Sequence, residues 1–205
     1  MVVIHYTAME TADAACARLC DEMSEVSAHY LISEQGAVIQ LVDEDMRAWH
    51  AGAGAWGAVT DVNSHSIGIE LANTGCAPFA GAQMDALEKL LGGIQDRWAI
   101  PAIRIVGHSD MAPARKFDPG PRFDWRRLAL GGFSVWPDRA EAINGSWVDF
   151  LVYAGAFGYR CDDKDALLSA FRMRFMPYKT GDLDAVDIGV IKLLADRWPC
   201  GDGLA

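Results

Sequence analysis

The sequence has 205 residues, of which 51% are hydrophobic and 22% charged, and this composition excludes a mainly disordered chain. Its formal net charge of −10 disfavours nonspecific nucleic-acid binding, because an acidic surface repels phosphate backbones. No apolar run approaches the roughly 18 residues of a membrane-spanning helix. The opening MVVIH lacks the basic region and apolar stretch of a signal peptide. We therefore expect no transmembrane segment and a cytoplasmic location for the chain as written, or a cell-envelope location if the N-terminus is incomplete.

The first 125 residues alternate between strand-like and helix-like patterns. In chain order, they predict a strand, a helix, a strand pair, a strand, a helix and a strand: residues 2–4, 11–26, 30–32 with 38–42, 66–71, 84–98 and 103–106. Thr11 is the expected N-cap of the first helix. This order predicts an α/β fold in which a mixed central β-sheet is flanked by helices.

The composition changes after Trp125. Glycine, proline and charged residues predict a linker over residues 131–146. Helical spacing follows in three short segments: residues 147–153, 166–175 and 187–198. We therefore predict an α/β domain over residues 1–130 and a small C-terminal three-helix domain over residues 147–205, which packs against the larger domain.

Two histidines and one aspartate form a possible metal site. His5 ends the first predicted strand, His108 ends the last, and Asp118 lies ten residues later in a proline-rich loop. Neighbouring strand ends meet at one edge of a sheet, and two imidazoles with one carboxylate are a known set of ligands for catalytic zinc. Two hydrogen-bonded core histidines and a turn aspartate are the alternative, which spacing alone slightly favours.

Six segments carry a family resemblance: residues 4–8 (IHYTA), 28–32 (AHYLI), 48–52 (AWHAG), 66–71 (SIGIEL), 106–110 (VGHSD) and 115–121 (RKFDPGP). In these segments, and in their order, the sequence resembles the type 2 zinc-dependent N-acetylmuramoyl-L-alanine amidases, which are related to peptidoglycan recognition proteins. The resemblance covers residues 2 to about 125. Family members usually have a segment before the first zinc histidine, whereas four residues precede His5 here.

The resemblance implies that residues 1–130 are a zinc amidase domain. It implies that His5, His108 and Asp118 bind Zn²⁺ and that Glu70 and Lys116 are catalytic. The implied reaction is hydrolysis of the amide bond between N-acetylmuramic acid and L-alanine, in peptidoglycan or in muropeptides. A peptidoglycan-binding protein without catalysis is the alternative, although it would not need an intact metal set.

Four more residues are weaker candidates for substrate binding: His29, His50, Asn73 and Arg115. A packed, hydrogen-bonded role is equally compatible with the two histidines, and a turn role with Asn73. Residues 157–159, 170–175 and 181–184 are similar to the helical peptidoglycan-binding module of some of these amidases, although ordinary helix packing produces such a pattern too. The oligomeric state does not follow from the sequence.

Overall fold

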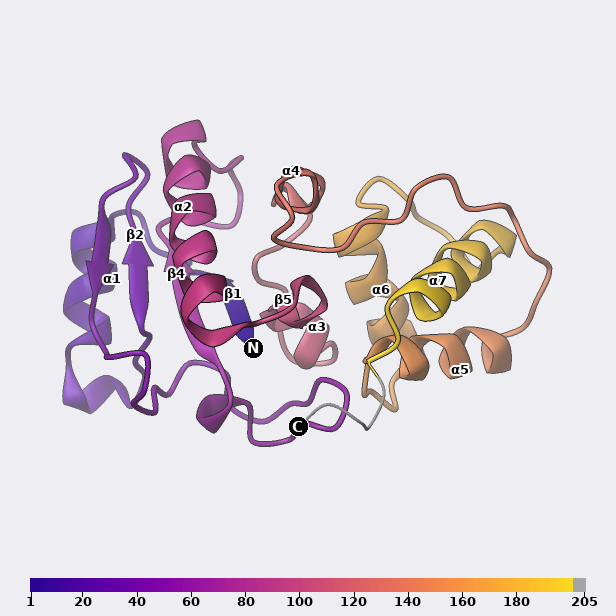
Figure 1. Ribbon diagram of the computed structural model, residues 1–205, viewed down its shortest axis with the longest axis horizontal. Coiled ribbons are helices and arrows are strands. Elements are labelled where there is room, and N and C mark those ends of the chain that lie inside the picture. The colour runs from indigo at the N-terminus through magenta and orange to yellow at the C-terminus, as the bar shows by residue number, and fades with distance from the viewer. Residues whose placement is uncertain (201–205) are drawn as a thin grey trace.

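The computed structural model describes residues 1–200, so the last five residues of the predicted C-terminal domain lie outside the described part (Figure 1). Its strands are β1 (Val2–Tyr6), β2 (Tyr30–Ile32), β3 (Val38–Gln40), β4 (Ile67–Leu71) and β5 (Ile105–Gly107). Its α-helices are α1 (Ala12–Leu19), α2 (Gly81–Trp98), α3 (His108–Met111), α4 (Trp125–Leu130), α5 (Trp147–Phe157), α6 (Lys164–Phe175) and α7 (Ala185–Arg197). Short 3₁₀ turns lie at Glu22–Ser24, Val62–Ser64 and Ala102–Arg104.

The strands form one sheet in the order β3-β2-β4-β1-β5. β1 is parallel to β4 and β5, β2 is parallel to β4, and β3 pairs antiparallel with β2. The predicted α/β class with a mixed central sheet is therefore confirmed. Figure 1 shows the sheet with α1 and α2 on one side of the molecule and the three helices α5–α7 on the other.

Side-chain alternation along the strands sends apolar residues to both faces of the sheet. Val2 and Ile4 of β1 belong to the core that α2 covers with its apolar stripe. Val3, between them, belongs to a second core that extends into α5, α6 and α7. His5 follows the same alternation, and its side chain therefore lies on the Val3 face.

Local sequence signals explain where several helices begin. Thr11 caps α1 as predicted, because its hydroxyl accepts a hydrogen bond from the Ala14 amide at 3.1 Å. The helix stops at Leu19 rather than near residue 26, since the carboxylate of Asp21 accepts from the Met23 amide and starts a separate 3₁₀ turn. Ser146 caps α5 and Asp184 caps α7, each with an aspartate three residues later in a capping box.

Residues 131–146 contain no helix or strand, but part of the segment is packed. Ser134 and Val135 are buried, and the ring of Trp136 lies 5.9 Å from that of Phe175 in α6. One core cluster also includes residues on both sides of this segment, for example Trp56 and Phe157. The division at residues 130 and 147 stays a prediction, and the buried contacts make the two parts neighbours in one core.

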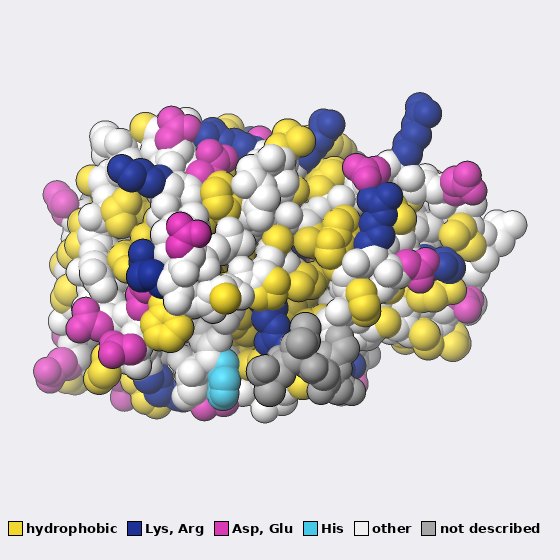
Figure 2. Space-filling model, viewed as in Figure 1, with side chains coloured by type: hydrophobic (Ala, Val, Ile, Leu, Met, Phe, Trp, Pro, Cys, Tyr) yellow, Lys and Arg dark blue, Asp and Glu magenta, His cyan; other side chains and the backbone are white. Residues whose placement is uncertain are grey.

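The surface carries mixed charges. Figure 2 shows Lys and Arg side chains interspersed with Asp and Glu over the visible face, without a broad patch of one sign. No helix in the described part of the chain has both the length and the apolar character needed to cross a bilayer.

Candidate metal centre and active site

Three adjacent parallel strands end at the same edge of the sheet, where ligands commonly bind in α/β proteins. His5 near the end of β1 is in register with Glu70 near the end of β4. His108 follows directly after β5, whose Gly107 is in register with Ile4. The sheet thus places two imidazoles and one carboxyl group side by side.

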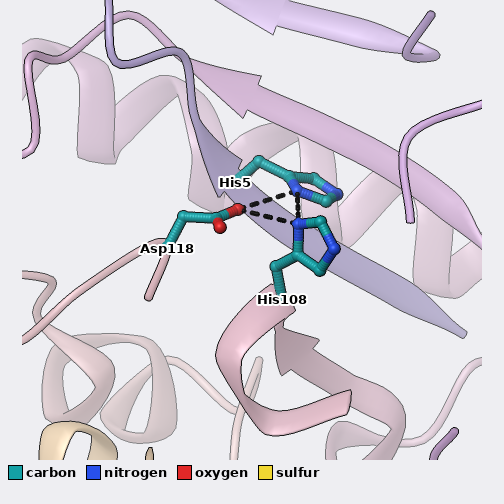
Figure 3. Close-up of side chains that lie close together, drawn as sticks. All are labelled: His5, His108 and Asp118. Atoms are coloured by element: carbon teal, nitrogen blue, oxygen red, sulfur yellow. Dashed lines mark hydrogen bonds and ion pairs between the residues drawn. The ribbon is translucent and has the colours of Figure 1, made fainter. Parts of the chain in front are cut away.

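The side chains of His5, His108 and Asp118 converge, as Figure 3 shows. The His5 Nδ1 atom lies 2.9 Å from His108 Nδ1 and 2.9 Å from Asp118 Oδ2, and His108 Nδ1 lies 3.1 Å from the same oxygen. All three residues are buried. Asp118 reaches the cluster from the loop after α3, which is held by a hydrogen bond from the Ser109 amide to the Asp118 carbonyl oxygen at 2.8 Å.

A chain of hydrogen bonds fixes the proton on the far side of the His5 ring. The hydroxyl of Ser66 donates to the Val62 carbonyl oxygen, so its own oxygen accepts from His50 Nε2 at 3.2 Å. His50 Nδ1 is then an acceptor, and it receives the Nε2–H of His5 at 3.0 Å. Burial, and after it the nearby His108 ring, lowers the pKa of His5 to about 4, so the ring is neutral near pH 7. The Nδ1 atom of neutral His5 therefore carries a lone pair.

His108 is oriented in the same way. Its Nε2–H donates to the Ala51 carbonyl oxygen at 2.8 Å, which leaves the lone pair on Nδ1. The two Nδ1 atoms and the Asp118 Oδ2 atom then face one another, each with a lone pair. None of these three atoms carries a proton. Such an arrangement is repulsive unless a cation lies among the three atoms, and an outer hydrogen bond that fixes each imidazole is typical of metal ligands.

The donor set fits zinc. The three side chains form the one group of His, Cys, Asp or Glu residues in the described chain that meets the geometry for holding a metal ion, with all donor atoms within 4.8 Å of one another. A tetrahedral zinc site with bonds of about 2.0–2.1 Å has donor atoms about 3.3 Å apart, close to the separations found here. Three protein ligands would leave the fourth position open, as in catalytic zinc sites.

Glu70 and Lys116 line the same cleft as the three clustered residues. The Glu70 Oε2 atom is buried and has no hydrogen-bond partner among residues 1–200. Burial, followed by the nearby Asp118 carboxylate, raises the pKa of Glu70 to about 8, although Lys116 opposes the rise. Lys116 is half-buried, and its ammonium group likewise has no hydrogen-bond or ion-pair partner within the described chain. Both groups are therefore available to a ligand in the cleft.

The segment that carries His50 is held in place by two side chains. The buried amide of Asn63 accepts from the backbone amides of His50 and Ala51, at 3.1 and 2.9 Å. Arg115 donates to the carbonyl oxygens of Ala51 and Ala53, so this exposed side chain supports the cleft wall. The His50 ring fills the space beside Gly68, where any Cβ atom would collide with it.

Seven of the nine predicted site residues line the cleft: His5, His50, Glu70, His108, Arg115, Lys116 and Asp118. His29 and Asn73 do not. His29 is fully buried, and its ring donates to the Met46 carbonyl oxygen and accepts from the Gly68 amide. The Asn73 side chain is buried in a turn, where it accepts from the Gly75 amide at 2.7 Å. These contacts support the packed and turn roles that the sequence left open.

The structure adds cleft residues that the sequence did not single out. Phe117 is 64% exposed and Trp49 is 58% exposed, and both line the cleft beside His5, His108 and Asp118. Arg18 of α1 and Tyr6 at the end of β1 also line the cleft. Phe117 lies between the predicted site residues Lys116 and Asp118, and this position in the sequence could have identified it as a cleft residue.

Comparison with known proteins gives the family. Residues 1–121 match the family model described as N-acetylmuramoyl-L-alanine amidase. The N-acetylmuramoyl-L-alanine amidase AmiD of Escherichia coli is 35% identical over 97% of this chain and 83% of AmiD. The 1,6-anhydro-N-acetylmuramyl-L-alanine amidase AmpD of Enterobacter cloacae is 45% identical over 50% of this chain and 55% of AmpD.

Solved structures agree with the sequence matches. AmiD from E. coli, in complex with anhydro-N-acetylmuramic acid-L-Ala-D-γ-Glu-L-Lys, superposes with a TM-score of 0.89 at 35% identity, covering 97% of this chain and 89% of AmiD. AmpDH3 from Pseudomonas aeruginosa, in complex with anhydromuramic pentapeptide, gives a TM-score of 0.88 at 30% identity over 97% and 92% of the two chains. The chain belongs to the N-acetylmuramoyl-L-alanine amidase family and is an enzyme of this class. The predicted resemblance is thus confirmed.

Proposed function

We propose that the enzyme is a zinc-dependent amidase that hydrolyses the bond between N-acetylmuramic acid and L-alanine in peptidoglycan or muropeptides. The observation that carries the proposal is the convergence of His5 Nδ1, His108 Nδ1 and Asp118 Oδ2 beside the unpaired carboxyl group of Glu70. The muramyl-peptide ligands named for the AmiD and AmpDH3 complexes support the substrate class.

His5, His108 and Asp118 would hold the zinc ion. When bound, zinc supplies Lewis acidity, which activates water for attack and polarises the scissile carbonyl group. The protein contributes the fixed position of the three donors. The outer partners of the two imidazoles, His50 and the Ala51 carbonyl oxygen, keep the lone pairs directed into the cluster.

Glu70 would move the proton. Its Oε2 atom accepts a proton from the attacking water and returns it to the leaving nitrogen of L-alanine, so that the amine departs as a neutral group. The positive charge of a bound zinc ion would favour the ionised carboxylate, which accepts the proton, and the protonated form then donates it to the leaving nitrogen. The buried position of Oε2 keeps bulk water from competing for the proton.

Lys116 would stabilise the negative charge that develops on the carbonyl oxygen. Its ammonium has no partner of its own in the described chain, so it is available for this charge in the transition state. Trp49 and Phe117 present exposed aromatic rings along the cleft, where they would pack against the sugar ring and the apolar parts of the peptide. The cleft has a volume of about 360 Å³, which is in the range of small-ligand sites.

A peptidoglycan-binding protein without catalysis is a weaker alternative. It would need neither the three converging donors nor an unpaired carboxyl group beside them.

We also propose that α5–α7 bind the cell wall, because their sequence is similar to a peptidoglycan-binding module. Tests of this role require the full-length enzyme.

The test of the proposal is metal removal and restoration. Full-length enzyme is stripped with a chelator, the absence of zinc is verified by elemental analysis, and hydrolysis of anhydro-N-acetylmuramic acid-L-Ala-D-γ-Glu-L-Lys is followed by mass spectrometry. We expect activity to be lost with the metal and to return with about one equivalent of zinc, while magnesium fails to restore it. Full activity in verified metal-free enzyme would overturn the proposal.

A further inference from the structure

A second groove lies where the sheet-bearing part of the enzyme meets the three C-terminal helices. It is formed by two segments, residues 121–126 and residues 174–179, together with Pro78 and Trp136, and we call it the junction groove. Its volume is about 920 Å³. In Figure 1 the first segment leads into α4, at the border between the two parts, and the second includes the end of α6.

The junction groove is close to the proposed zinc ligands His5, His108 and Asp118. Pro121, at its edge, follows Asp118 by three residues, and three residues of extended chain span at most about 11 Å. It shares no lining residue with the catalytic cleft. A polymer with one repeating unit in the cleft could therefore place another unit in the junction groove, whereas a single small muropeptide would be confined to the cleft.

Two of its positive charges have no partner. Arg122 and Arg126 are exposed, and neither guanidinium group forms an ion pair or hydrogen bond with another residue of the described chain. The other cations of the groove are neutralised within the protein. Arg174 pairs with Asp110, and Lys179 pairs with two carboxylates of α7 and its cap.

The single carboxylate of the groove, that of Asp124, accepts from the Arg127 amide as the N-cap of α4. The groove therefore offers two unpaired guanidinium groups on a chain whose formal net charge is −10. The negatively charged molecule does not attract anions over a long distance. The ligand that complements the two guanidinium groups is therefore one that presents carboxylates at close range.

Aromatic surface accompanies these charges. Tyr178 is 94% exposed at the rim of the groove. Trp136 is half-buried and packs against Phe175. Pro121 and Pro177 restrict the backbone of the two walls. A restrained groove with aromatic rings and free guanidinium groups suits a ligand with both apolar and carboxylate parts.

We propose that the junction groove binds uncleaved stem peptides of polymeric peptidoglycan, next to the repeating unit that occupies the catalytic cleft. The choice of polymer rests on the proposed function. The D-γ-Glu residue of such a peptide carries a free α-carboxylate, which Arg122 and Arg126 are placed to receive, and Tyr178 covers its apolar atoms. Binding of this second unit raises the effective concentration of enzyme on the wall without altering the reaction itself.

The test is sedimentation of the full-length enzyme with two forms of insoluble peptidoglycan sacculi. One form is native, and in the other the stem-peptide carboxylates have been converted to amides. A Glu70→Gln background prevents digestion during the measurement. The variant to compare is Arg122→Glu/Arg126→Glu, and the matched control is Arg139→Glu, because Arg139 is also exposed and unpaired within residues 1–200 but lies outside the groove.

We expect the double variant to bind native sacculi about tenfold more weakly than the parent, the combined effect of two exposed cation–carboxylate contacts. The parent should bind amidated sacculi as weakly as the double variant does, and the Arg139→Glu control should bind like the parent. Arg122→Lys/Arg126→Lys should retain most of the binding, because the charge is kept.

A second readout separates this proposal from the proposed function. In the Glu70-containing enzyme, Arg122→Glu/Arg126→Glu should leave hydrolysis of a soluble muropeptide unchanged, which also shows that the variant is folded. If the parent fails to hydrolyse muropeptides, the proposed function fails, while sedimentation still tests the groove. Equal binding of the double variant and the parent to native sacculi, or equal binding of the parent to native and amidated sacculi, would overturn the inference.

Discussion

Asp110 and Arg174 form a buried ion pair that joins α3 to α6, with 2.7 Å between Asp110 Oδ2 and Arg174 Nη1. Each side chain is 1% exposed. Asp110 lies two residues after His108, and its carboxylate also accepts from the Gly107 amide at 2.8 Å and from the Tyr159 hydroxyl at 2.8 Å. The turn that presents a predicted metal ligand is thus held partly by the C-terminal helical part.

Replacing Arg174 should destabilise the whole enzyme. Arg174→Met leaves the Asp110 carboxylate buried without its cation, which typically costs about 3–5 kcal/mol of unfolding free energy. Tyr159→Phe is a milder control, because it removes one hydrogen bond to the same carboxylate and should cost about 1–3 kcal/mol. Urea denaturation measures both. An Arg174→Met enzyme whose unfolding free energy is within about 0.5 kcal/mol of the parent's would contradict a stabilising role for the ion pair.

This ion pair is a contact between the two parts of the chain that local sequence patterns could not predict. Glycine, proline and helical spacing correctly located the irregular segment and the three helices after it. The helix α5 continues past its predicted end to Phe157, where Gly158 follows. The helices α6 and α7 each begin two residues earlier than predicted, directly after the caps Asp163 and Asp184. No local pattern could pair Asp110 with Arg174, because 64 residues separate them and neither belongs to a periodic apolar stripe.

His50 should influence zinc affinity although we do not assign it as a ligand. His50→Phe removes the acceptor that holds the Nε2–H of His5, so the His5 ring is no longer restricted to the tautomer with a lone pair in the cluster. We expect zinc affinity to fall about 10–100-fold, as for other outer partners of metal ligands. Competition with a chromogenic chelator measures it.

The matched control for this variant is His65→Phe. His65 is exposed and lies in the same loop region, but its ring contacts the Asp61 carbonyl oxygen rather than the cluster. Zinc affinity of this control should equal that of the parent. An unchanged affinity in His50→Phe would show that the hydrogen-bond chain does not orient His5.

Substitution of Glu70 or Lys116 should lower the turnover rate without lowering the zinc content. Glu70→Gln removes the proton acceptor, and Lys116→Met removes the cation proposed to stabilise the developing oxyanion. Each should lower kcat by about 10²–10⁴-fold, with zinc content near that of the parent. Steady-state kinetics on a soluble muropeptide, with elemental analysis of the same samples, tests both roles. A variant with near-parental kcat removes that residue from the mechanism.

Much of the site was predictable because its main residues occupy strand ends and motif positions. The strand pattern placed His5 and His108, the proline-rich loop after His108 supplied Asp118 as the third candidate, and the family resemblance added Glu70 and Lys116. The sequence could not decide between a ligand-binding and a packed role for His29, His50 and Asn73, because this depends on which partners the fold brings to their polar atoms. Asn63, which positions His50, carries no signal that distinguishes it from an ordinary loop residue. Ser66 falls in a segment that matches the family, but the match does not show that its hydroxyl contacts His50.

Glu44 should contribute stability that disappears in acid. Its carboxylate accepts from Tyr30, Arg97 and Trp98, at distances of 2.6–2.9 Å. The hydrogen bonds from Arg97, then those from Trp98 and Tyr30, lower the pKa of Glu44 to about 2 although burial opposes the shift. Because the folded state has the lower pKa, the contribution is fully present above the ordinary value of 4.5 and is lost as the pH falls towards 2.

Glu44→Gln is the variant that measures this contribution. We expect it to lower the unfolding free energy by about 1–2 kcal/mol at pH 7. The difference from the parent should shrink steadily below pH 4.5, as determined by urea denaturation across a pH series. A difference that grows as the solution is acidified would contradict the predicted direction.

The His5–His108–Asp118 cluster is proposed to support cleavage of one particular amide bond, and mass spectrometry of the products from anhydro-N-acetylmuramic acid-L-Ala-D-γ-Glu-L-Lys tests this. We expect two products from the zinc-loaded enzyme, anhydro-N-acetylmuramic acid and the intact tripeptide. We expect neither product from His5→Ala or His108→Ala enzyme that remains folded. Cleavage within the tripeptide, or the same two products from a folded His5→Ala enzyme at the parental rate, would contradict it.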